Sequence, residues 1–236
     1  EFKIKDILGY KPGYKVGIRL ESRIPLATFE RFIVKKQALS VSDERVVLDE
    51  GFRTKVHENM NEIRSALRKN KRLDKLFEGL AVAKAGNQYL RQHIEMLCEV
   101  LCGLAVRLGW ISERSIDKLI YVAFLHDVRF SQYPKLAQIQ SIKEFNAQSL
   151  YMSENEHKAF FEAPLYASEL ARQDLEAYPD AIKILLQQKE LPDGTGFPHG
   201  LTAMQLAPLS CLFITAHYFV DYVIDHPDWS MEDFVK

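Results

Sequence analysis

The spacing of apolar residues divides the chain into a short part with strand-like patterns and a long helical part. Residues 15–20 (KVGIRL) alternate between polar and apolar, and short β-branched runs follow at 32–34 and 46–48. These patterns are typical of half-buried strands. From residue 54 to 84 the apolar positions instead recur at helical spacing. The pattern therefore predicts a small N-terminal α/β or β module, followed by a connecting helix.

Helical spacing continues beyond this point. Past residue 86 the apolar residues repeat at intervals of three and four, with His93 on the apolar face, as in an amphipathic helix. Ser153-x-x-Glu156 is a capping box, which predicts a helix start. Further helices are expected at 181–190 and 209–224. The fold class expected is mainly α: a helical bundle over residues 81–236, with the N-terminal module and its connecting helix over residues 1–80.

Composition and charge exclude several classes of protein. Apolar residues make up 47% of the chain and charged residues 27%, which is ordinary for a globular protein and argues against disorder. The formal net charge is −1, whereas non-specific nucleic-acid binders carry a basic excess. The basic stretch at 64–75 is interpreted as a solvated helix face or, alternatively, a partner surface. No nucleic-acid partner is expected.

The cysteines and the apolar runs indicate a cytoplasmic protein. Three cysteines without a framework are typical of reduced thiols. The N-terminal residues EFKIKDILGY are too charged for a signal peptide. The apolar run at 206–224 contains His217 and Asp221 and is interpreted as a buried helix, so no membrane span is expected. A capping pattern at Ser230 and Asp233 begins where the sequence stops, so we expect a longer natural protein.

Two ionisable residues, His126 and Asp127, end a very apolar segment (AFLHD). Burying an imidazole and a carboxylate there costs free energy unless each has a partner. A metal ion is one such partner, and a hydrogen bond between the two side chains is the other. These two residues alone leave both alternatives open.

Three further features stand in an order that resembles a known family. His93 lies on one predicted helix, the His126–Asp127 doublet ends a later one, and the segments EAPLYASELA (162–171) and PDGTGFPHGL (192–201) follow. This order resembles the HD-GYP family of HD-domain phosphohydrolases over about residues 87–236. The resemblance implies a helical bundle of a bacterial signalling protein. It also implies cyclic di-GMP phosphodiesterase activity with two or three metal ions, usually iron or manganese.

The chain retains residues that match one half of the family's metal site. His93, His126 and Asp127 match ligands of the first metal, and His217 stands where the family has an aspartate. Histidine is also a good ligand for transition metals. A single residual metal site at these four residues is therefore one expectation, and a histidine that only packs in the core is the alternative for His217.

The other half of the family's site is lost. The positions of the second-metal ligands hold Ala163, Gln188 and Lys189, and the family's catalytic lysine position holds Phe130. An ammonium at Lys189 repels a cation, and we hypothesise that it supplies its own positive charge in place of the second metal. The polar residues expected in a residual pocket are Arg129, Glu162, Gln188 and Lys189.

The loop that corresponds to the GYP motif keeps its shape without its tyrosine. Gly194 and Gly196 are expected to provide special backbone angles and Pro198 a fixed turn. Phe197 keeps the aromatic ring and loses the hydroxyl group, while Asp193 is expected to cap the turn. The loop is interpreted either as a partner contact or as a plain connection between two helices.

The expected function is that of a catalytically inactive or strongly impaired HD-GYP-like domain. It would act as a regulatory binding module for a protein partner, such as a signalling domain, or for a cyclic dinucleotide, and it could form homo-oligomers. The alternative is a phosphohydrolase with one metal ion at His93, His126, Asp127 and His217. A scaffold for oligomerisation is a third interpretation. No cofactor is expected, or else a single transition metal, iron or manganese.

Overall fold

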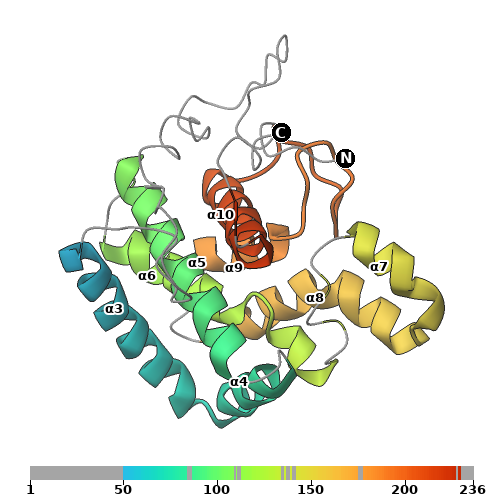
Figure 1. Cartoon of the computed structure of the whole chain (residues 1–236), viewed down its shortest axis with the longest axis horizontal. Coiled ribbons are helices and arrows are strands. Elements are labelled where there is room, and N and C mark those ends of the chain that lie inside the picture. The colour runs from blue at the N-terminus through green and yellow to red at the C-terminus, as the bar shows by residue number, and fades with distance from the viewer. Residues whose placement is uncertain are drawn as a thin grey trace.

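The computed structural model describes residues 50–83, 87–108, 110, 113–133, 136, 139, 142–174, 178–226 and 228–229. The expected N-terminal α/β or β module lies outside these residues. The described part of the chain is mainly helical and contains no strand, which confirms a mainly α fold. Its helices are α3 (Glu50–Lys69), α4 (Lys71–Ala83), α5 (Asn87–Arg107), α6 (Glu113–Leu125), η2 (Val128–Gln132), α7 (Ile142–Gln148), η4 (Ser149–Tyr151), α8 (Glu154–Arg172), α9 (Pro179–Gln187) and α10 (Pro208–Asp225) (Figure 1).

The helical stretch expected at 54–84 consists of two helices, with a break at Asn70. The side-chain oxygen of Asn70 accepts hydrogen bonds from the backbone N–H groups of Arg72, at 3.0 Å, and Leu73, at 3.4 Å. Asparagine favours such local bonds over a continued helix, because its side chain competes with the backbone for donors. The connecting helix therefore turns at this point, and α4 starts in a new direction (Figure 1).

The main core surrounds α10, which lies near the middle of the helical assembly (Figure 1). Its apolar residues are buried on nearly every side, and they share one core cluster with residues of α5, α6 and α9. Val56 and Met60 of α3 and Leu73 and Leu76 of α4 belong to the same cluster. The connecting segment thus packs on the bundle, and the division of the chain at residue 80 stays a prediction.

The run at 206–224 forms the buried helix α10, as expected. Within the described ranges, no helix has the length and the apolar composition that crossing a bilayer requires. The three cysteines are free and buried. Cys98 and Cys102 are core residues of α5, where a free cysteine packs as a small apolar residue.

Helix α8 begins with the capping box that the sequence predicts. The Ser153 hydroxyl oxygen accepts from the backbone N–H of Glu156 at 3.3 Å, and the Glu156 carboxylate accepts from the Ser153 backbone N–H at 2.8 Å. Both bonds satisfy donors that the first turn of a helix leaves without intrahelical partners. The capping box therefore stabilises the start of α8, which carries part of the second apolar cluster described below.

Replacing Ser153 by Ala is expected to lower the free energy of unfolding by about 1 kcal/mol, because the cap of α8 is lost. Urea denaturation followed by circular dichroism measures this change. Ser65→Ala is the matched control, since Ser65 lies exposed inside α3 and Ala is a better helix former there. Equal stability of the two variants would contradict the capping role.

Candidate metal centre

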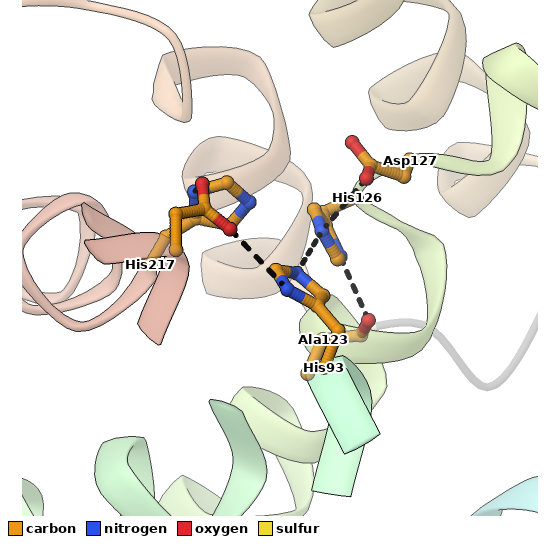
Figure 2. Close-up of polar contacts among 6 residues, drawn as sticks. His93, Ala123, His126, Asp127 and His217 are labelled. Atoms are coloured by element: carbon orange, nitrogen blue, oxygen red, sulfur yellow. Dashed lines mark hydrogen bonds and ion pairs between the residues drawn. The ribbon is translucent and has the colours of Figure 1, made fainter. Parts of the chain in front are cut away.

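Three histidines and one aspartate from separate segments meet in the core (Figure 2). His93 comes from α5, His126 and Asp127 follow the end of α6, and His217 comes from α10. Each side chain offers one ligand atom, and these four atoms lie within 4.8 Å of one another. The three imidazole rings have centroids 4.9–5.3 Å apart. The sequence-predicted set of four residues is therefore brought together.

Backbone contacts fix the orientation of the His126 ring. Its Nδ1 lies 2.8 Å from the carbonyl oxygen of Ala123, and a carbonyl oxygen only accepts hydrogen bonds, so Nδ1 carries the proton and donates. Its Nε2 faces the cluster, 3.3 Å from Asp127 Oδ2 and 3.3 Å from His93 Nε2. This is how metal-binding histidines are commonly held.

A second carboxylate lies behind the other two histidines. Asp221 Oδ1 is 3.3 Å from Nδ1 of His93, and Asp221 Oδ2 is 3.1 Å from Nδ1 of His217. Among the described residues, no group hydrogen-bonds to the buried Nε2 of His217. This nitrogen is therefore available as a metal ligand.

The environment keeps the His217 ring neutral and the Asp221 carboxylate charged. Burial lowers the pKa of His217, and the negative charge of Asp221 only partly opposes this effect. Burial alone would raise the pKa of Asp221, but the contact with His217 and the nearby charges of His93 and Lys189 hold it well below its usual range. A neutral imidazole is the form that binds metal ions.

The donor set fits a transition-metal ion. The 3.3 Å between Nε2 of His93 and Nε2 of His126 agrees with the roughly 3.3 Å that separates two nitrogens each about 2.0–2.1 Å from a tetrahedral ion. Two nitrogen lone pairs at this distance repel each other unless a cation or a proton lies between them. Three imidazoles and one carboxylate suit Fe²⁺ or Zn²⁺ better than Mn²⁺.

The site is enclosed by protein. The side chains of His93 and His126 are 1% and 2% exposed, and that of His217 is 11% exposed. The ring of Phe213 covers His126 and His217, with a centroid 5.7 Å from each imidazole. Sites closed by four protein ligands are typically structural, whereas catalytic sites keep an open coordination position.

Residues at three positions that the resemblance links to catalysis lie in a separate apolar cluster. Phe130, Ala163 and Phe197 are buried together with Phe145 and Phe160. The ring of Phe160 stacks on those of Phe145 and Phe130, with centroids 4.1 and 6.3 Å away, and lies 5.4 Å from Phe197. Aromatic side chains therefore fill this part of the bundle. Other members of the aromatic cluster are Leu136, Ile139 and Ala159.

The loop at residues 192–201, called the GYP-like loop below, is held in place by a buried carboxylate. Glu190, which is fully buried, accepts hydrogen bonds from the backbone N–H groups of His199, at 2.7 Å, and Leu201, at 2.8 Å. Asp193 accepts from the N–H and the hydroxyl group of Thr195, so it caps the turn as the sequence predicts. The Phe197–Pro198 peptide bond is cis.

The two glycines of this loop serve different purposes. Gly194 has a φ of +82°, which confirms that it provides an unusual backbone angle. The same interpretation is wrong for Gly196, which is not among the positive-φ glycines of the described residues. A Cβ atom at Gly196 would lie 2.1 Å from the backbone nitrogen of Leu191. Gly196 is therefore needed because the chain passes close to itself.

Two of the residues expected in a residual pocket, Glu162 and Arg129, contact other side chains of the described part of the chain. Glu162 is half exposed on the surface of α8, and its Oε1 lies 3.9 Å from Nζ of Lys158. The guanidinium group of Arg129 lies over the rings of Tyr133 and Tyr166, at 4.9 and 4.7 Å, and donates to Gln132. Arg129 therefore contacts two aromatic rings and an amide group.

Gln188 and Lys189 follow α9. Gln188 is buried, and its amide group makes no hydrogen bond to any described residue. Lys189 is half-buried, and its charge lowers the pKa values of both His217 and Asp221. The positive charge of Lys189 therefore acts on the histidine cluster, and its role in place of a second metal stays a prediction.

Two residues of the site were missed by the sequence analysis. Asp221 follows His217 by four residues on α10, so both side chains lie on one helix face. A charged residue at this spacing in an apolar helix was the signal that could have found it. Phe213, four residues before His217, carried no such signal, because it is one apolar residue among many.

No family model matches the chain, and no curated protein or solved structure is significantly similar to it.

Proposed function

We propose that this chain is a regulatory binding module of the HD-GYP type, which holds one transition-metal ion and does not cleave cyclic di-GMP. The observation that carries the proposal is the aromatic cluster at Phe130, Ala163 and Phe197. The resemblance assigns to these positions the lysine, histidine and tyrosine of an active phosphodiesterase. Apolar side chains there offer no ligand for a second metal and no hydrogen bond to a phosphate.

The chemistry supports binding over cleavage. Hydrolysis of a phosphodiester needs a metal-bound nucleophile and cations that offset the charge of the phosphoryl oxygens. Removing one such stabilising group commonly lowers the rate by about 10²–10³, and here several are replaced together. The remaining residues, His93, His126, Asp127 and His217, are buried and would hold a single ion. Such an ion would cross-link α5, the end of α6 and α10.

The proposal also covers the binding partner of the protein and its location in the cell. The partner would be a protein or a cyclic dinucleotide, the two classes that the resemblance implies. Buried free cysteines support a reducing, cytoplasmic setting.

Elemental analysis of protein purified without chelator tests the proposal. About one transition-metal ion per chain is expected for a mononuclear site of this composition, together with no turnover of cyclic di-GMP when iron or manganese is added. The variant His199→Ala is the matched control, because His199 is exposed on the loop, and it should retain the metal. Robust turnover of cyclic di-GMP, or a metal-free protein after reconstitution, would refute the proposal.

One observation favours the alternative, a mononuclear phosphohydrolase. The four convergent side chains are the set that would hold a metal ion able to supply an activated water. His217 is the most exposed of the three histidines and would be the side from which a substrate approaches. Metal-dependent hydrolysis of a simple phosphate ester by the wild-type protein, lost in His217→Ala, would support this alternative.

A further inference from the structure

We infer that Asp221 is a positioning residue of the metal site, whose single carboxylate orients two of the ligands, His93 and His217. This inference rests on the metal binding proposed above. Asp221 would not touch the ion itself. It would hold both imidazoles in the tautomer that turns their Nε2 atoms toward the other ligands.

The carboxylate divides its two oxygens between two helices. Oδ1 lies 3.3 Å from Nδ1 of His93, on α5, and Oδ2 lies 3.1 Å from Nδ1 of His217, one turn earlier on α10. An ionised carboxylate only accepts hydrogen bonds. Nδ1 of His217 donates to Oδ2, whereas the contact at Nδ1 of His93 lies within ion-pair distance but outside hydrogen-bond geometry. With its proton on Nδ1, each imidazole would present an unprotonated Nε2.

The positions of the Nε2 atoms are consistent with protons on the Nδ1 atoms. Nε2 of His93 lies 3.3 Å from Nε2 of His126, which is itself oriented by the Ala123 carbonyl group. Figure 2 shows the rings of His93 and His126 directed toward each other, with His217 beside them. Each of the three histidines thus has an acceptor behind it, and Asp221 serves two of them. Such outer partners fix the ring and raise its basicity.

Charge supports the same role. Asp127 and Asp221 are both buried, with side chains 5% and 11% exposed. Carboxylates in the core are costly to bury without a compensating positive charge, and a divalent cation would supply that charge. Asp221 therefore adds to the attraction for the ion as well as to the orientation of its ligands.

Asn is a discriminating replacement, since it has nearly the same shape. Its amide offers one acceptor oxygen and one NH₂ donor, so it satisfies Nδ1–H of one histidine and opposes Nδ1–H of the other. One imidazole must then take the wrong tautomer or turn away. Loss of an outer partner typically weakens metal binding about 10–100-fold, and we expect Asp221→Asn to fall within this range.

The experiment uses Co²⁺ as the probe and the full chain. Affinity is measured by competition with a chromophoric chelator, and the visible absorption spectrum of the bound Co²⁺ reports the ligand geometry. Thr215→Val is the matched control: Thr215 is buried on the same helix, and its hydroxyl group donates to the Cys211 carbonyl group. This control should keep the wild-type affinity and spectrum, whereas Asp221→Asn should show weaker binding and an altered spectrum.

The outcomes separate the two proposals. Wild-type affinity and an unchanged spectrum in Asp221→Asn would overturn the positioning role while leaving metal binding intact. A wild-type protein that binds no Co²⁺ would overturn both. If Asp221→Asn does not fold, NMR of the zinc-loaded wild-type imidazoles decides: protonated Nδ1 and metal-bound Nε2 are expected at His93 and His217, and metal-bound Nδ1 at either residue would refute the inference.

Discussion

Replacing His126 by Ala is expected to remove the metal-dependent part of the protein's stability. An ion that binds only the folded protein stabilises it by about 4 kcal/mol when its free concentration is about 1,000 times Kd. His126 contacts both His93 and Asp127 through the same nitrogen, so its loss takes away the ligand at the centre of the set. The wild-type protein should therefore resist urea better with Zn²⁺ than with a chelator, and the variant should show no such difference.

The comparison between loaded and metal-free protein makes this test specific. His126→Ala also leaves a cavity beside Phe213, which lowers the stability of both forms and cancels in the difference between them. His157→Ala is a suitable control, since His157 bonds to the Ser149 carbonyl group at the start of α8 and lies outside the set of four. It should keep the full zinc-dependent stabilisation. An equal effect of Zn²⁺ on wild type and His126→Ala would show that stabilising zinc binds elsewhere.

The helical fold and the His126–Asp127 pair were accessible from local patterns in the sequence, whereas His93 and His217 became candidate ligands only through the resemblance. The capping box at Ser153 and the apolar periodicity around His93 depend only on near neighbours in the chain. His126 and Asp127 stand out because ionisable residues in an apolar segment are costly without partners. The break at Asn70 was missed, because apolar spacing continues through it and the side-chain cap gives the only signal.

The other features of the site and of the loop depend on contacts between distant segments, which the periodicity of apolar residues does not encode. Nothing local shows that Asp221 reaches His93 across two helices. Likewise, the resemblance marked Phe130, Ala163 and Phe197 as lost polar positions, but their packing around Phe160 emerges only from the fold. Gly196 was assigned the wrong reason, since a close approach of the chain to itself is invisible in a list of residues.

Replacing Glu190 by Ala is expected to destabilise the GYP-like loop and the whole domain. The buried carboxylate accepts two backbone hydrogen bonds, from His199 and Leu201, and bonds to charged groups contribute about 1.5–3 kcal/mol each. Part of this is recovered when water reaches the exposed N–H groups, so we expect a loss of about 3 kcal/mol in the free energy of unfolding. Urea denaturation of the chelator-treated protein measures it without a contribution from metal binding.

The reason why Glu190 matters more than its neighbours is burial. Asp193 also accepts two hydrogen bonds, both from Thr195, but its side chain is exposed, so Asp193→Ala should cost only about 1 kcal/mol. Glu190→Gln keeps the shape and one acceptor, and it should lie between the two. Because the loop carries Phe197 into the aromatic cluster with Phe160, its release would also open this cluster. If Glu190→Ala were no less stable than Asp193→Ala, the loop would be held by its own backbone turns, and the buried carboxylate would have no part in closing that region.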